Sequence, residues 1–177
     1  MNFNLILSSS RNRESDAVDE FMKLIDDNLE ESPLVEISDI QGIILAFTET
    51  DPLEVIDLFK KMVTEEPWHF RYILRVIPVQ ISCSTNLREI LDGSCRLFKK
   101  VSDESSFKIV VEKRHCSIRS QEIILAIASR ITNKVDLSCP DWIVLIEIVG
   151  KRTGISVLRP EHILSIAKQK MSGFRNK

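Results

Sequence analysis

The positions of the apolar residues predict the secondary structure of the N-terminal part of the chain. Apolar and polar residues alternate over 3–7, the period of a strand, and apolar residues recur every three or four positions over 18–29, the period of a helix. Two short strands follow within 35–47, then a helix over 51–63 and a strand over 72–81. The order β-α-β-β-α-β is that of a ferredoxin-like module, in which helices cover one face of an antiparallel sheet.

The second of these helices has a clear start. The carboxylate of Asp51 is placed to accept hydrogen bonds from free backbone N–H groups, and Pro52 occupies a position that needs no donor. Glu54 follows at the spacing of a capping box. The helix is therefore predicted to begin directly after Asp51.

The second half of the chain has a different order of elements. Asn86 and Glu89 favour the start of a helix, and apolar residues alternate in a strand over 107–111. Another helix begins at Ser120. The nearly unbroken apolar run 143–149 is typical of a central strand that is covered on both faces.

The chain is then predicted to turn back. Residues 150–154 have the composition of a hairpin turn, and 155–158 pair back as a strand. Pro160 is placed at the start of a last helix. The two halves therefore differ in architecture as well as in order.

Charge is sorted by half. Up to Phe70 the chain has 5 Lys/Arg and 16 Asp/Glu, a balance of −11, and from Arg71 onward it has 19 and 10, a balance of +9. The whole-chain value of −2 hides this asymmetry. One explanation of the asymmetry is two modules with different partners, of which the basic module binds a polyanion. The other is two modules whose charged faces are simply solvated.

The sequence holds no signature of catalysis or of a nucleotide cofactor. G-x-G-x-x-G, a Walker A loop, G-x-S-x-G and H-E-x-x-H are absent, and glycine is scarce. His115 and Cys116 are adjacent, so on a strand they point to opposite faces and form no nucleophile–base pair. We therefore expect no catalytic residue, no cofactor and no metal.

Three carboxylates keep an enzymatic alternative open. Asp136, Asp141 and Glu147 would form an acid–base or metal cluster if the fold brought them together. Glu147 lies inside an apolar strand, where a carboxylate needs a partner, and Lys113 or Lys108 on a neighbouring strand would serve. We interpret Glu147 as structural.

Cysteine content and hydropathy bear on location. The four cysteines form no C-x-x-C pair, which favours free thiols in a reducing cytosol over disulfides. No apolar run approaches the ~18–20 residues of a membrane span, and residues 1–7 are predicted as a strand rather than a signal peptide. We expect a cytoplasmic protein that meets no membrane.

Basic residues are the main functional signal of the second half. They are spread over several elements rather than held in one tail, so a folded surface gathers part of them into a patch that contacts phosphates. Aromatic residues are few: Trp68, Phe70 and Tyr72 cluster at the junction of the halves, and Trp142 precedes the apolar strand. They either stack on unpaired bases or pack the two domains together.

The second half of the chain holds a series of short motifs in a defined order. They are R-x-x-P-V from Arg75, F-K-I-V-V-E-K-R from Phe107, S-Q-E-I from Ser120, N-K-V-D-L from Asn133, P-D from Pro140, V-L-I-E-I from Val144 and G-I-S-V from Gly154. In this order and spacing, over 75–167, they resemble a THUMP domain, the RNA-binding module of tRNA modification proteins. They are most similar to the stand-alone THUMP proteins, of archaeal and eukaryotic type, that assist tRNA cytidine acetylation.

The resemblance implies a ferredoxin-like domain over 1–74 and a THUMP domain of helices packed on a small mixed sheet over 75–177. It also implies that the protein binds the tRNA acceptor region and its single-stranded 3′ end. His115-Cys116 and Lys151-Arg152-Thr153 depart from the family pattern. Together with the basic composition, the resemblance predicts RNA contacts by Arg75, Lys108, Lys113, Arg114, Arg119, Lys134, Lys151 and Arg152.

The function expected from this resemblance is that of an adaptor without catalytic activity. It would present tRNA to an RNA cytidine acetyltransferase that makes 4-acetylcytidine. One alternative is an RNA-binding subunit for another tRNA modification, thiolation or methylation. A second is a self-sufficient RNA-modifying enzyme, and a third is a ferredoxin-like module that senses a small molecule.

Overall fold

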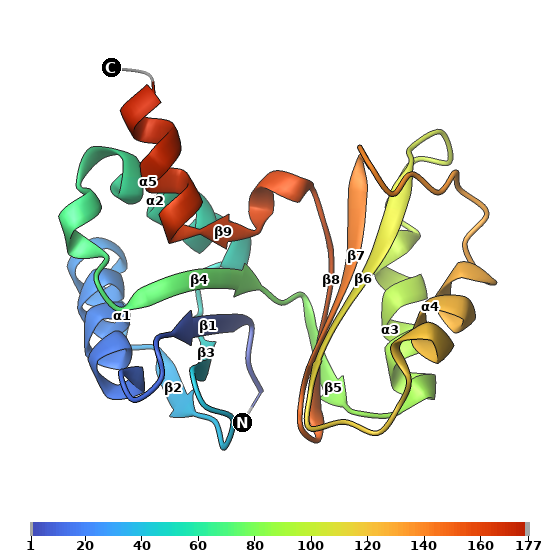
Figure 1. Ribbon diagram of the computed structural model, residues 1–177, viewed down its shortest axis with the longest axis horizontal. Coiled ribbons are helices and arrows are strands. Elements are labelled where there is room, and N and C mark those ends of the chain that lie inside the picture. Colours follow the sequence, from blue (N-terminus) through green and yellow to red (C-terminus); the bar gives the residue numbers. More distant parts are fainter. Residues whose placement is uncertain (1, 176–177) are drawn as a thin grey trace. The chain divides into compact units, whose positions relative to one another are not determined.

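The computed structural model describes residues 2–175, which divide into two compact units (Figure 1). The described residues of Met1–Pro78 and His162–Lys177 form unit 1, and Val79–Glu161 forms unit 2. The chain therefore leaves unit 1 after Pro78 and returns to it at His162. None of the helices over the described residues is both long enough and apolar enough to cross a membrane.

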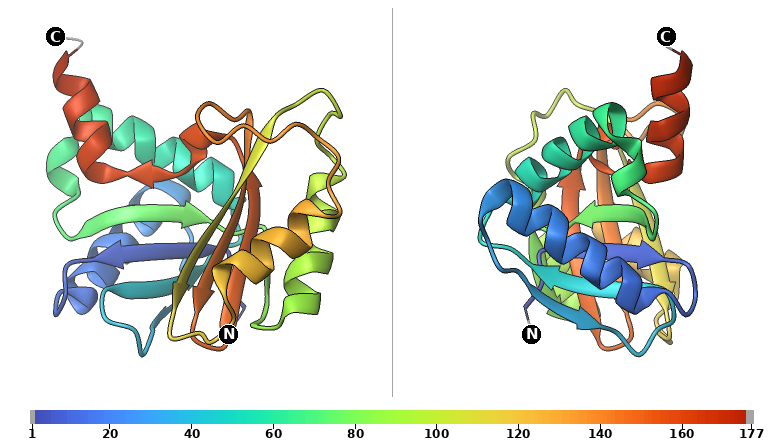
Figure 2. Two further views of the ribbon diagram at one scale, coloured as in Figure 1. Left: turned by 45° about the vertical axis from the view of Figure 1, so that its right-hand side comes forward. Right: turned by 90° about the vertical axis from the view of Figure 1, so that its left-hand side faces the viewer.

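Unit 1 is a five-stranded antiparallel sheet with the strand order β2-β3-β1-β4-β9, and its helices α1 and α2 cover one face (Figure 2). The first four strands and two helices have the predicted β-α-β-β-α-β order. Its elements are β1 (Leu5–Ser9), α1 (Glu14–Leu29), β2 (Leu34–Ile37), β3 (Ile43–Phe47), α2 (Pro52–Glu65), the 3-10 turn η1 (Pro67–His69), β4 (Ile73–Pro78), β9 (Leu164–Ser165) and α5 (Ile166–Arg175).

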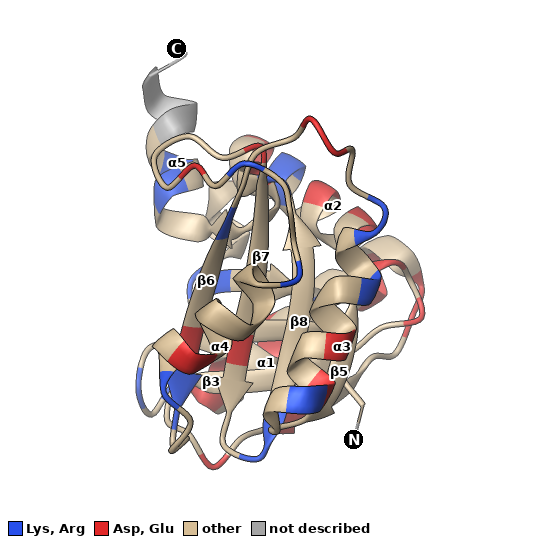
Figure 3. Cartoon of the chain, turned by 90° about the vertical axis from the view of Figure 1, so that its right-hand side faces the viewer, with Lys and Arg blue, Asp and Glu red and all other residues tan. Residues whose placement is uncertain are grey.

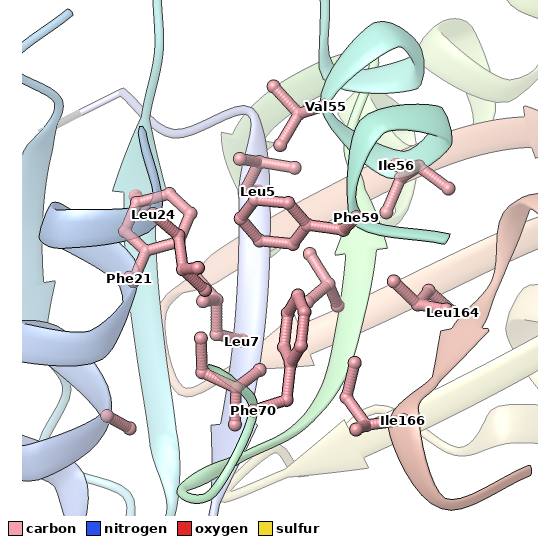
Figure 4. Close-up of a cluster of buried hydrophobic side chains, with 14 of the residues drawn as sticks. Leu5, Leu7, Phe21, Leu24, Val55, Ile56, Phe59, Phe70, Leu164 and Ile166 are labelled. Atoms are coloured by element: carbon pink, nitrogen blue, oxygen red, sulfur yellow. The ribbon is translucent and has the colours of Figure 1, made fainter. Parts of the chain in front are cut away.

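Edge-to-face contacts between aromatic rings stabilise the core of unit 1. The ring of Phe59 on α2 contacts Phe21 on α1 edge-to-face, with 6.0 Å between centroids, and Phe70 at 5.4 Å (Figure 4). Such contacts add ~0.5–1.5 kcal/mol to the burial of the rings. Leu164 and Ile166, from the segment that returns at the end of the chain, are buried in the same cluster.

Unit 2 has a four-stranded mixed sheet in the order β5-β8-β7-β6, in which β6 and β7 are parallel. Helices α3 and α4 pack on one face of this sheet (Figure 3). Every residue from Ile143 to Val149 is buried, which confirms the predicted central strand. The elements are β5 (Ile81–Ser84), α3 (Leu87–Phe98), β6 (Phe107–Arg114), α4 (Ser120–Ala128), β7 (Trp142–Val149) and β8 (Arg152–Leu158).

Both predicted helix starts are confirmed. Leu53 N–H donates to Asp51 Oδ1 at 2.8 Å, and Glu89 N–H donates to Asn86 Oδ1 at 2.9 Å. Farther along α3, a Cβ on Gly93 would lie 2.6 Å from Ile155 Cδ1. The helix therefore approaches β8 closely at the one residue that has no side chain.

The strand predicted over 72–81 is two strands in different sheets. β4 ends at Pro78, which has no N–H to continue the ladder, and β5 begins at Ile81. Gln80 N–H already bonds to Ile155 O in unit 2, at 3.1 Å. The change of sheet thus takes place within two residues.

The predicted helix at Pro160 and the predicted second domain over 75–177 both need correction. Pro160–His162 is a single 3-10 turn, η2, after which β9 pairs with β4 and α5 follows. The described residues from His162 onward therefore belong to unit 1, because β4 supplies the backbone partners and the unit 1 core buries Leu164. The predicted boundary at 74/75 lies four residues before the observed one.

Candidate nucleic-acid interface

Five of the eight predicted RNA-contacting residues meet at one end of the unit 2 sheet. Because β6 and β7 are parallel, both end there, and Gly150 N–H donates to Arg114 O at 3.0 Å. Gly150 has φ +62°, which allows the tight turn into β8. We call this the turn end, and it comprises Lys113, Arg114, Arg119, Lys151 and Arg152.

Two turn-end cations already have structural partners. Arg114 donates to the carboxylate of Glu147 at 2.9 Å, and Lys113 Nζ donates to Ile118 O at 2.8 Å. We expected Lys113 or Lys108 to pair with Glu147, and the observed ion pair is with Arg114. The register explains the difference: Glu112 lies opposite Glu147, so Arg114 shares that face, whereas Lys113 lies opposite Ile148 on the helix side.

Arg119 and Lys151 are two further exposed cations of the turn end. Arg119 directly precedes α4, and Lys151 occupies the turn between β7 and β8. Thr85 N–H donates to Lys151 O at 3.0 Å, which fixes the backbone of that turn. Arg152, the first residue of β8, is half-buried. The turn end therefore offers a small number of free charges for phosphate contacts.

Lys108 and Lys134 lie at the opposite end of the sheet, where three further cations gather that the predicted site left out. Lys108 is near the start of β6, and Lys134 O accepts the N–H of Phe107 at 2.9 Å. Figure 3 shows Lys and Arg at both ends of the sheet. We call this second group the helix end, and it comprises Lys99, Lys108, Arg130, Lys134 and Arg159.

A shallow hollow of about 280 Å³ lies at the helix end. Lys99, at the end of α3, and Arg130, just after α4, both line it. Asn133 Nδ2 holds the adjoining loop by donating to Ser102 O and Ser105 O at 2.9 and 3.0 Å. This group could have been predicted from the sequence, because basic residues follow the ends of two helices.

Trp142 is partly covered by a neighbouring cation. The guanidinium of Arg159 lies 4.3 Å from the centroid of the Trp142 ring, in a cation–π contact. Arg159 also donates to Asp141 O at 3.5 Å. One face of this indole is thus occupied within unit 2, which limits its use as a platform for an RNA base.

The three carboxylates of the alternative catalytic site each hold local structure. Asp136 Oδ1 accepts the N–H groups of Cys139 and Ser138, both at 2.9 Å, and these bonds lower the pKa of Asp136. Asp141 accepts the N–H and the hydroxyl of Ser106, and these bonds lower its pKa. Within residues 2–175, no three His, Cys, Asp or Glu side chains are grouped to hold a metal ion.

The cysteines are free thiols over the described residues. Burial, with a smaller contribution from Glu89, raises the pKa of Cys83 to about 11. Burial also raises the pKa of Cys95, and the positive charge of Arg130 offsets part of this rise. His115 is exposed with φ +53°, whereas Cys116 packs against the apolar core. These two residues therefore point into different surroundings.

Arg75, the eighth predicted RNA contact, lies in unit 1. It is half-buried on β4, opposite Ser8 on one neighbouring strand and Ser165 on the other. Its motif R-x-x-P-V therefore ends the ferredoxin-like sheet rather than starting the second domain.

Comparison with known proteins identifies unit 2. Residues 84–158 match the family model of the THUMP domain, and this match lies wholly within Val79–Glu161. These residues therefore form a THUMP domain, as the motifs predicted. A search of curated proteins found no match.

Solved structures with a similar fold match most of this chain. Protein PH1313 from Pyrococcus horikoshii is 16% identical with a TM-score of 0.64 over 89% of this chain and 55% of its own. A 4-thiouridine synthetase in an RNA complex with bound ATP is 14% identical, with a TM-score of 0.59 over 89% and 42%. TrmN from Thermus thermophilus is 13% identical, with a TM-score of 0.56 over 89% and 46%. The chain spans about half the length of these proteins, and at such identities the likeness is one of fold.

Proposed function

We propose that this protein binds tRNA through its THUMP domain. The match of residues 84–158 to the THUMP family carries the proposal. Two further facts support it: unit 2 has 13 Lys/Arg against 10 Asp/Glu, and a protein with the same fold is an RNA-bound synthetase. A polyanion is the ligand that such a domain attracts over distance.

Phosphate contacts fall to the cations that project freely from the two ends of the sheet. Arg119 and Lys151 serve at the turn end, and Lys99, Arg130 and Lys134 at the helix end. β7, which runs from one end of the sheet to the other, has eight residues at ~3.3 Å each. The two ends are therefore far enough apart for a nucleic acid strand to run along the domain. Arg114 forms an ion pair with Glu147, so its contribution to RNA binding is the stability that this pair gives to the domain.

A gel shift with total tRNA tests this proposal. Arg119→Ala/Lys151→Ala and Lys99→Ala/Arg130→Ala should each weaken binding, and each lost contact should reduce the log–log salt slope by ~0.7–0.9. Lys61→Ala/Lys168→Ala removes the same charge from exposed positions of unit 1 and is the matched control. Absence of binding by the unmodified protein at low salt would overturn the proposal.

Recognition of the single-stranded 3′ end is the second part of the proposal. The similarity of the motifs to THUMP proteins supports it. The unpaired bases of a tRNA 3′ end also offer faces that can stack on aromatic side chains. Removing the terminal nucleotides of tRNA should weaken binding clearly. Equal affinities for trimmed and intact tRNA would leave only backbone contacts.

The finer role that we propose is an adaptor for tRNA cytidine acetylation. The ordered motifs from Arg75 to Gly154 support it, because they are most similar to stand-alone THUMP proteins of that kind. The purified protein should acetylate nothing, whereas its addition to the acetyltransferase with acetyl-CoA and ATP should yield 4-acetylcytidine in tRNA. Acetylation by the protein alone would favour the self-sufficient enzyme, and unchanged acetylation without it would favour a subunit for thiolation or methylation.

A further inference from the structure

The sheet of unit 1 has an open edge at β2. This strand comes first in the order β2-β3-β1-β4-β9, and within residues 2–175 no strand pairs with its outer side (Figure 1). Ser38 N–H, just after β2, donates to Ile43 O at 3.1 Å. Alternate residues of an antiparallel strand direct their backbone groups to the same side. Glu36 therefore faces β3 with its backbone, whereas Val35 and Ile37 direct their N–H and C=O groups outward.

The side chains at this edge are mainly apolar. Leu34 and Ile37 are 60% and 46% exposed, and Phe47, which lies opposite Leu34 on β3, is 37% exposed. Leu34 and Ile37 are three positions apart, so they lie on opposite faces of the sheet. Charged side chains, proline or a covering segment usually protect such an edge, and Glu36 is the one charged residue of β2. The edge is therefore suited to accept another strand.

The surroundings of this edge are acidic. Residues 24–59 hold ten Asp/Glu and no Lys, Arg or His. The loop between β1 and α1, which adjoins the β2–β3 turn, brings two arginines, and Arg13 already pairs with Asp16 at 3.0 Å. Among the described residues of these elements, Arg11 is thus left to oppose three exposed carboxylates that flank β2 and β3: Glu30, Asp39 and Glu49.

We propose that β2 binds an extended segment of a protein partner as an additional strand, with apolar side chains in the middle of that segment and Lys or Arg at its ends. The outward N–H and C=O groups of Val35 and Ile37 match the backbone of such a strand. Its apolar residues cover Leu34 and Ile37. Its basic ends meet Glu30 and Asp39, which lie on either side of β2 in the sequence.

Register and charge disfavour the other occupants of this edge. If two copies of the chain paired symmetrically through β2, Val35 of each copy would lie opposite Ile37 of the other. The two Glu36 side chains would then face each other directly, and like charges at such a cross-strand position are destabilising. The same acidic surroundings repel the phosphates of RNA. A basic protein segment is therefore the occupant that this edge selects.

This inference goes beyond the proposed function and does not depend on it. β2 belongs to unit 1, whereas the turn end and the helix end belong to unit 2. Binding of the protein segment and binding of tRNA can therefore be disabled by separate substitutions.

Amide hydrogen exchange of the full-length protein, followed by NMR, tests the inference. The probe is the peptide R-K-V-T-V-T-V-K-R. It should slow the exchange of the Val35 and Ile37 amides in a saturable way, because these N–H groups gain acceptors. The amides of Leu34 and Glu36 already face β3 and should change little. The peptide E-E-V-T-V-T-V-E-E has the same middle and should bind at least about tenfold more weakly.

Two sets of variants separate the backbone from the charges. Ile37→Pro removes one outward donor, at a position where an edge strand tolerates proline, and should weaken peptide binding about fivefold or more. Ile37→Val keeps the donor and is its matched control. Glu30→Gln/Asp39→Asn should weaken binding about two- to fivefold at low salt. Asp19→Asn/Glu65→Gln removes the same charge from exposed positions of α1 and α2 and should leave binding unchanged.

Three outcomes would overturn the inference. The first is unchanged exchange of the Val35 and Ile37 amides at saturating basic peptide. The second is equal slowing by the acidic peptide or by oligouridine RNA. The third is slowing that increases with protein concentration when no peptide is present, which would mean that a second copy occupies the edge. Should Ile37→Pro fail to fold, the charge variants and the alternating amide pattern still decide. The tRNA gel shift should be the same for all folded variants, and its loss in the unmodified protein would count against the proposed function alone.

Discussion

At the scale of single residues, Glu147 is the most constrained position. It is the only charged side chain among the described residues that is buried, at 1% exposure, and Arg114 pairs with it. Removing one partner of such a pair costs far more than the pair itself contributes, because a desolvated charge is left behind. A residue that we expected to contact RNA therefore stabilises the domain.

Arg114→Leu should lower the free energy of unfolding of unit 2 by ~2–4 kcal/mol, somewhat below the cost of breaking a fully buried pair because Arg114 is 29% exposed. Urea unfolding followed by Trp142 fluorescence, in a Trp68→Phe background so that only unit 2 is reported, measures the loss. Lys113→Leu is the matched control and should cost below ~1 kcal/mol. Arg114→Leu/Glu147→Leu should recover part of the stability, and equal losses for Arg114→Leu and Lys113→Leu would contradict the assignment.

The thiols should differ in reactivity by position. At pH 8 a thiol with a pKa of about 11 is ~0.1% thiolate, so Cys83 should resist alkylation. Cys139 is exposed and should be alkylated first. Since burial raises the pKa of Cys83, its labelling should increase only as the pH rises toward 11. Mass spectrometry of iodoacetamide-treated protein checks the order, and early labelling of Cys83 would contradict the burial of its thiol.

At the scale of elements, the C-terminal segment is part of the first unit. Leu164 of β9 is 2% exposed within the unit 1 core. Leu164→Ala should therefore cost ~2–4 kcal/mol, and the loss should fall on unit 1. Peptide-resolved hydrogen exchange locates it: protection should decrease in α1, β1 and β4. Leu125→Ala, at a 61% exposed position of α4, is the control, and lost protection confined to unit 2 would contradict the placement of β9.

The elements with strong local signals could be predicted from the sequence. The side chains of Asp51 and Asn86 accept hydrogen bonds from backbone N–H groups at the starts of their own helices. The apolar run 143–149 indicates a buried strand from its local sequence alone. β9 has two residues and no period of its own, so pairing with β4 alone defines it. The partner of Glu147 likewise depends on the register of β6 and β7, which no local pattern contains.

At the scale of the whole molecule, the charge asymmetry is smaller than the halves of the sequence indicate. Unit 1 has 11 Lys/Arg and 16 Asp/Glu, a balance of −5, and unit 2 has a balance of +3, because Arg71, Arg75 and the basic C-terminal segment fall in unit 1. The difference between the modules therefore lies in local clusters of charge rather than in large net values.

The affinity for tRNA should nevertheless fall steeply with salt. The free cations at the two ends of the unit 2 sheet predict a log–log slope of several units, at ~0.7–0.9 per neutralised phosphate. Gel shifts at a series of salt concentrations measure the slope. A flat response would mean that uncharged contacts dominate and that the basic clusters have another role.

The return of the chain to unit 1 has a consequence for biosynthesis. Unit 2 is contained within Val79–Glu161, so it can complete its sheet as soon as those residues have left the ribosome. The sheet that begins with β1 still lacks β9 at that moment, and its core lacks Leu164 and Ile166. Translation of unit 1 therefore begins before that of unit 2 but is completed after it, and until then the edge of β4 that pairs with β9 is open to chaperones and to aggregation.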